Sequence, residues 1–282
     1  MEGIRIHPHN VIFSLYGQYV LPRGEDIWIG GLIQALAALD CSAGAVRALV
    51  SRMKRKGLLH SRRSGRHSFY RLSDRGLKEV RWGGKQAFVP SGGGWDGRWT
   101  VVTYSIPEKR RKCRDALRDS LNGLGFGTLA PGTWISPRQL TPEAEGKWRE
   151  LDAWQYLEVF RAEHLAPSDP GTLVAQAWPQ LSTLADHYHS YVATYEPALR
   201  HFTDKVLDDK ACFATRLRSL IDFVAITLGD PALPPALLPQ DWARPPAQAL
   251  FKELQHALAR PAERFFDAVY EKGEETDVKK VR

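Results

Sequence analysis

Cysteine is scarce in this 282-residue sequence, which holds only Cys41, Cys113 and Cys212. Three cysteines spaced so far apart exclude a disulfide framework and a CxxC zinc site, and they fit a reducing compartment. Long apolar runs are also lacking, since no segment approaches about 18 unbroken apolar residues, the length that a membrane-spanning helix needs. The first ten residues, MEGIRIHPHN, lack the apolar core of a signal peptide. We therefore expect a cytoplasmic protein with no membrane partner.

Acidic residues are nearly absent from one stretch of the chain. Residues 47–81 hold twelve Lys or Arg but only two acidic residues, Asp74 and Glu79, so this stretch carries a net charge of +10. The rest of the chain carries −3, and the whole chain +7. Because concentrated positive charge attracts polyanions, this distribution favours a nucleic-acid-binding segment within an otherwise near-neutral protein.

Three helices and a hairpin are predicted around this basic stretch. Apolar residues at helical spacing predict helices over 10–22 and 26–39. Ser42 is a good N-cap for a third helix, over 43–56, whose predicted buried stripe is Val46, Leu49, Val50 and Met53. LLHSRRSGRHSFYRL then predicts two strands around a Ser-Gly turn. This order is that of a winged helix-turn-helix, in which the third helix enters the DNA major groove.

The exposed face of the third helix combines small and basic residues. Small residues at its start allow close approach to DNA, Arg47 is placed to reach a base edge with support from Ser51, and the remaining basic residues suit phosphates or the minor groove. The predicted DNA contacts are Ser42, Ala43, Gly44, Arg47, Ser51, Arg52, Lys54, Arg55, Arg62, Arg63, Arg66 and His67. A merely solvated basic face is the alternative, but the combination of three helices with a basic hairpin favours double-stranded DNA.

Beyond residue 82 the sequence predicts two further domains after a linker. The glycine-rich residues 83–97 form the expected linker. Residues 98–166 show the order β-α-β-(β)-α-β, which predicts a ferredoxin-like sandwich. Residues 167–282 are expected to be a helical domain for dimerisation and effector binding, with helices over 172–202, 205–228 and 246–270. With a winged helix-turn-helix over 1–82, the predicted fold class is α+β.

A nuclease on the ferredoxin-like segment is the enzymatic alternative. Such a nuclease needs a carboxylate at the end of its first strand to hold a divalent metal, and the strand predicted over 99–106 has none before Glu108. Glu108 is instead expected to start a helix. A metal site at His187 and His189 is disfavoured, because helical residues two apart point about 200° apart. We therefore expect no enzyme, no catalytic residue, no metal and no cofactor.

Long motifs run through nearly the whole chain. The first four are LYGQYV, IWIGGLIQAL, SAGAVRALVSRMKRKGLL and GRHSFYRLSDRG, followed by WDGRWTVVTYSIPEKRR, LGFGTLAPGTWISP, VFRAEHL, GDPALPPALLPQDW and ALFKEL. These motifs resemble the PaaX family, which are bacterial repressors of phenylacetate degradation. The resemblance implies a cytosolic transcriptional repressor that binds a palindromic operator as a homodimer, with a middle domain like the ferredoxin-fold CRISPR-associated nucleases.

The resemblance also implies an effector that releases the protein from DNA. It would be an acyl-CoA thioester, which is phenylacetyl-CoA in the namesake members. Arg161 and His164, at the end of the last strand of the middle domain, are candidate contacts to a CoA phosphate, although Arg161 could equally pair with Glu158 or Glu163. DFVAITLGDP stands where members often carry a His-Glu-Tyr-Arg-like stretch. A ligand-independent, architectural DNA-binding protein is the remaining alternative.

Overall fold

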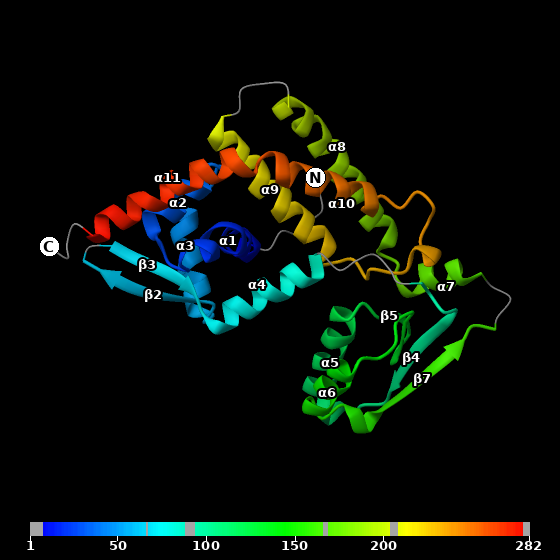
Figure 1. The fold of residues 1–282 in the computed structure, drawn as a ribbon. Coiled ribbons are helices and arrows are strands. Elements are labelled where there is room, and N and C mark those ends of the chain that lie inside the picture. Colours follow the sequence, from blue (N-terminus) through cyan, green and yellow to red (C-terminus); the bar gives the residue numbers. More distant parts are fainter. Residues whose placement is uncertain (1–7, 66, 88–93, 166–168, 204–207, 279–282) are drawn as a thin grey trace. The chain divides into compact units, whose positions relative to one another are not determined.

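The computed structural model is an α+β structure with two small antiparallel sheets (Figure 1), which confirms the predicted class at this level. It describes residues 8–65, 67–87, 94–165, 169–203 and 208–278. The chain divides into two compact units: unit 1 comprises residues 1–88, 187–228 and 243–282, and unit 2 comprises residues 89–186 and 229–242. In the described part of the chain, no helix has the length and apolar character needed to cross a membrane.

The first two helices of unit 1 follow the apolar spacing of the sequence, with one correction. α1 (Pro8–Leu15) continues into a π-helical turn, Tyr16–Val20. The helix predicted over 26–39 begins later, because Ile27–Trp28 form a short strand, β1, and α2 spans Ile29–Ala37. The Trp28 indole covers the start of α2, where only glycine leaves room for the ring.

α3 (Ala43–Arg55) begins where the sequence predicted and ends one residue before the predicted end at 56. The Ser42 hydroxyl accepts a hydrogen bond from the Ala45 amide at 3.2 Å, which caps the first turn. After the last turn, Gly57 adopts a positive φ of 67°, a conformation that glycine tolerates without strain.

A hairpin and a fourth helix follow α3. β2 (Leu59–Ser64) and β3 (His67–Leu72) pair in an antiparallel ladder, and β1 adds to β3 to give the strand order β1-β3-β2. The ladder pairs Ser64 with His67, which makes Gly65 the first residue of the turn. α4 (Asp74–Ala87) then extends over 83–87, so the start of the predicted linker is helical. Propagating an existing helix is easier than starting one, which offsets the cost of about 1 kcal/mol for each glycine.

Two segments predicted as single helices are each divided at a proline. A proline removes an amide donor and disfavours helical geometry in the residue before it. Trp178, before Pro179, is not helical and separates α7 from α8, and Leu258, three residues before Pro261, separates α10 from α11. The C-terminal helices are α7 (Pro170–Ala177), α8 (Leu181–Thr203), α9 (Asp209–Thr227), α10 (Arg244–Ala257) and α11 (Ala259–Val278).

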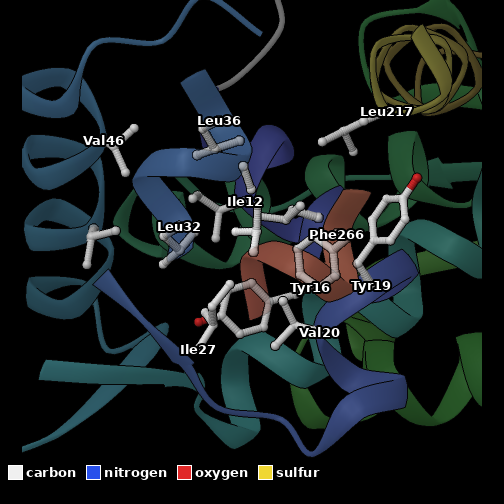
Figure 2. Packing of buried hydrophobic residues seen from close by; sticks show 14 of the residues in the cluster. Ile12, Tyr16, Tyr19, Val20, Ile27, Leu32, Leu36, Val46, Leu217 and Phe266 are labelled. Carbon is white, nitrogen blue, oxygen red and sulfur yellow. The ribbon is translucent and has the colours of Figure 1, made fainter. Parts of the chain in front are cut away.

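One apolar core joins residues from both ends of the chain in unit 1. Figure 2 shows Ile12, Tyr16 and Tyr19 of the first helical segment beside Leu217 of α9 and Phe266 of α11. The Tyr19 ring lies 5.0 Å from the Phe266 ring, measured between centroids. The same core takes in the buried stripe of α3, so the C-terminal helices help to seat the basic helix.

Unit 2 is built on a four-stranded antiparallel sheet with the order β5-β6-β4-β7. One face packs Val102 and Trp134 against Leu117 and Trp148 of two helices, and the other face packs Trp99 against α7. The tryptophans of the sheet and its helices therefore fill cores. The strands are β4 (Arg98–Tyr104), β5 (Gly127–Ala130), β6 (Thr133–Ser136) and β7 (Leu157–Glu163), and the helices are α5 (Arg111–Gly123) and α6 (Pro142–Glu150).

Candidate nucleic-acid interface

α3 separates a buried apolar face from an exposed basic face. The predicted stripe is confirmed, since all four of its members are buried: Val46, Leu49, Val50 and Met53. On the opposite side the helix exposes the predicted Gly44, Arg47, Ser51, Arg52, Lys54 and Arg55, with Ala43 half-buried. A Cβ added at Gly44 would meet no atom within 4 Å, so a partner can approach the first turn closely. The Ser42 side chain is exposed, but its hydroxyl already caps the helix.

The positive charge of this face is not neutralised by the residues that the structure describes. In the described residues, no carboxylate forms an ion pair with Arg47, Lys54 or Arg55. Arginines of unit 2 contrast with these, because Arg149, for example, pairs with Glu145 one helical turn away. The exposed face of α3 therefore keeps its charge available for a polyanionic partner.

The hairpin arginines point to opposite faces of the sheet. Arg62 lies opposite Phe69 in the ladder and Arg63 opposite Ser68. The Arg62 guanidinium donates to Asp26 at 2.6 Å and lies 4.3 Å from the centre of the Phe69 ring. Arg62 is thus held on the sheet by contacts that were not predicted from the sequence. Arg63 is exposed on the other face.

Two more basic residues share the Arg62 face. His60 and Arg71 lie directly opposite each other in the ladder and are both exposed. The alternation of side chains along a strand is the signal that would have found them. His67 also lies on this face, with its ring edge-on to Trp28 at 5.5 Å. Arg66, a predicted contact at the turn, lies outside the described residues.

Arg161 of unit 2 binds a carboxylate that the sequence reading did not consider. Its guanidinium donates to both carboxylate oxygens of Asp96, at 2.6 and 2.8 Å, and to the Thr100 hydroxyl at 3.2 Å. The hydrogen bond from Arg161 is the main reason that the pKa of Asp96 lies below its usual value. Glu163, one of the expected partners, pairs with Arg98 instead. His164 is half-buried just after the end of this strand, and the effector role of both residues stays a prediction.

The end of β4, where a nuclease would need a carboxylate, is cationic. A cavity of about 600 Å³ there is lined by Ser105, Arg114 and Arg118 among others. Glu108 is exposed and accepts a hydrogen bond from Arg114 at 2.9 Å. This side-chain set suits an anion better than a divalent cation.

Three family models match successive parts of the chain. The PaaX-like protein model matches residues 7–76, the model of the PaaX protein central Cas2-like domain matches 92–174, and the model of the PaaX-like protein C-terminal domain matches 178–268. The three matches take up most of the sequence and follow one another without overlap.

One relative and one solved structure extend over nearly the whole chain. The chain is 29% identical over 280 residues to the transcriptional repressor PaaX of Escherichia coli (strain K12), a match that covers 97% of this chain and 86% of that protein. It is similar in fold to an uncharacterized protein from Mycobacterium tuberculosis, with a TM-score of 0.58 and 24% identity over 94% of this chain and 99% of the other. The second similarity concerns the fold alone.

Proposed function

This chain belongs to the PaaX-like protein family, and from that membership we propose that it is a transcriptional repressor that binds duplex DNA through α3 and the β2–β3 hairpin. The observation that carries the proposal is the un-neutralised basic face of α3, opposite a buried apolar stripe. A helix that reads the major groove needs both faces. Three helices followed by a hairpin support the winged helix-turn-helix arrangement proposed for residues 1–82.

Each basic side chain has a proposed role. Arg47, one turn into α3, reads a base edge, and Ser51 on the next turn supports it. Lys54 and Arg55, near the end of α3, bind phosphates together with Arg52. Arg63 extends these contacts from the hairpin, and DNA contacts by Arg66 and by His67, which lies on the opposite face from Arg63, stay part of the proposal. Arg62 serves to hold the hairpin through Asp26, which makes its proposed DNA contact weaker than the others.

Unit 2 is proposed to serve regulation, not catalysis. Its strand order, β5-β6-β4-β7, supports the ferredoxin-like arrangement predicted for residues 98–166. The cationic end of β4 gives no support to a metal-dependent nuclease. The predicted domain bounds, with a C-terminal domain over 167–282, stay part of the proposal, but α4 takes up residues 83–87 of the linker predicted over 83–97.

A homodimer on a palindromic operator is the proposed repressing state. Two α3 helices would enter successive major grooves, about 34–36 Å apart along the duplex. An acyl-CoA thioester, with phenylacetyl-CoA as the first compound to test, is proposed as the effector that releases DNA. Release requires that the effector bind more tightly to the conformation that does not match the operator. An architectural protein without an effector is the alternative, and it would stay on DNA whatever thioester is added.

Replacing Arg47 by alanine tests the reading role of α3. We expect a loss of roughly 1–3 kcal/mol on a duplex selected from a random pool by the wild-type protein, and a smaller loss on unselected duplex, because a base contact discriminates between sequences. Dissociation constants for both duplexes, measured by fluorescence anisotropy, give the comparison. Arg111→Ala, an exposed arginine of unit 2, is the matched control. Equal losses on the two duplexes would remove Arg47 as a base reader.

A further inference from the structure

A cavity of about 510 Å³ lies within unit 1, outside the proposed DNA interface. Its walls come from the first helical segment, from the second half of α4, and from α9 and α10. A cavity of this size falls within the range of roughly 300–1,000 Å³ of small-molecule sites. An apolar cavity of about 150 Å³ is already enough to hold benzene. The space therefore suits a ligand with an aromatic ring and several further atoms.

The walls of the cavity are mostly apolar. Trp82 on α4 is the most notable, because 47% of its surface is exposed, an unusual state for a large aromatic side chain. Gly83 and Gly84 follow it along the wall, and a Cβ at either would meet no atom within 4 Å. The other apolar side chains are Phe13, Val80, Leu220, Val224, Leu228 and Phe251.

The charged side chain in the wall is already neutralised. The Arg216 guanidinium donates to the backbone oxygen of Gln255 at 3.1 Å and to the Tyr19 hydroxyl at 3.3 Å, and it lies 3.7 Å from Glu263. Glu79, the other charged residue of the lining, is exposed. A ligand group that carries a charge would lose its hydration here without a matching partner, so the cavity favours a neutral group.

The two glutamine side chains of the wall, Gln18 and Gln255, bond to each other. Gln18 donates through its amide nitrogen to the side-chain oxygen of Gln255 at 2.6 Å. Its own side-chain oxygen is buried and has no donor among the described residues. Because protein atoms cover this oxygen, a ligand in the cavity does not reach it, and binding there depends on apolar contact.

We propose that this cavity binds the neutral aryl or short acyl end of a small-molecule effector through apolar contact with its walls. The proposal rests on the repressor function proposed above and assigns its effector a place. A free aromatic acid is a poor ligand, because its charged carboxylate would lose its hydration without a matching partner. The aryl end of an acyl thioester such as an acyl-CoA is neutral and therefore suits the cavity.

α4 connects the cavity to the DNA interface. Its first turn is fixed to the end of α3, since the Ser73 hydroxyl accepts from the Gly76 amide at 3.1 Å and donates to the Gly57 carbonyl at 2.6 Å. The contact is tight, because a Cβ at Gly76 would lie 2.3 Å from the Leu58 backbone oxygen. A ligand that separates the second half of α4 from α9 therefore moves the ends of α3 and of the hairpin with it, which changes the fit to DNA.

The test fills the cavity from one wall. Gly84→Leu places a side chain where a Cβ meets nothing, and Gly146→Leu on α6, which also meets nothing, is the matched control. Binding of phenylacetyl-CoA, phenylacetamide and phenylacetate is measured by calorimetry on the full chain, and DNA release by anisotropy. We expect the wild type and Gly146→Leu to bind the thioester and the amide and to bind the acid about tenfold or more weakly. Gly84→Leu should keep DNA binding and weaken the thioester and the amide about tenfold or more.

The outcomes separate this inference from the proposed function. If phenylacetyl-CoA releases the wild type and Gly84→Leu from DNA equally, the proposed repressor function is supported, but the cavity is not its effector site. Phenylacetamide could bind the wild type but not Gly84→Leu, while the thioester releases neither protein from DNA. In that case the cavity is a ligand site, and the proposal that a thioester is the effector is overturned. If none of the three compounds binds the wild type, the inference is overturned. Should Gly84→Leu lose DNA binding without ligand, Val224→Phe fills the same space from α9 and takes its place.

Discussion

A chain with Arg47, Lys54 and Arg55 all replaced by alanine is expected to bind its selected duplex at least about a hundredfold more weakly than the wild type. The loss combines one base contact with two phosphate contacts on the same exposed face of α3. Because each phosphate contact releases counterions, the slope of log affinity against log salt should also become shallower by about 2. Anisotropy titrations at several salt concentrations measure both quantities.

The control removes the same charge from the other unit. Lys109, Lys112 and Arg118 are exposed on or next to α5, and their replacement by alanine lowers the net charge equally. We expect this control to keep the affinity and the salt slope nearly unchanged. A comparable loss of affinity in both triple variants would show that DNA binding depends on the total charge of the protein and not on α3.

Phe213→Ala is expected to lower the free energy of unfolding by about 3–5 kcal/mol, the usual cost of truncating a fully buried phenylalanine. Phe213 on α9 is fully buried, and its ring lies 5.0 Å from the rings of both Tyr19 and Phe265. The missing ring leaves a void where the first helical segment meets α9 and α11. Urea denaturation followed by circular dichroism measures the change.

Phe160→Ala provides the comparison for this truncation. Phe160 on β7 is 53% exposed, so its removal should change the free energy of unfolding by no more than about 0.5 kcal/mol. If Phe213→Ala costs no more than Phe160→Ala, the shared core of the N-terminal and C-terminal helices is not the source of stability described above.

The features that the sequence predicted well are those with local signals. Ser42 caps α3 and Gly57 follows its end, and both effects act within one helical turn. The buried stripe of α3 depends only on spacing along one helix. The breaks after α7 and α10 also had local signals, Pro179 and Pro261. The prediction missed both breaks because it followed the apolar periodicity on either side of them.

The features that the sequence did not predict depend on residues far apart in the chain. β1 exists because Ile27 and Trp28 meet β3, and local periodicity had placed them in a helix. Arg62 binds Asp26, and Arg161 binds Asp96, across gaps that no motif spans. At the candidate site, the sequence therefore predicted the exposed charge of α3. It did not predict that Arg62 of the hairpin would bind a carboxylate of the protein itself.

Amide hydrogen exchange of the wild-type chain, with and without excess selected duplex, tests most directly the claim that α3 and the hairpin bind DNA. The first amides of α3 and the outer amides of the edge strand β2 have no partner in a helix or a ladder, so they should exchange quickly in the free protein. We predict that duplex slows exchange in α3 and in β2–β3, and leaves β4 to β7 unchanged. Protection confined to unit 2, with α3 and the hairpin unaffected, would contradict the account.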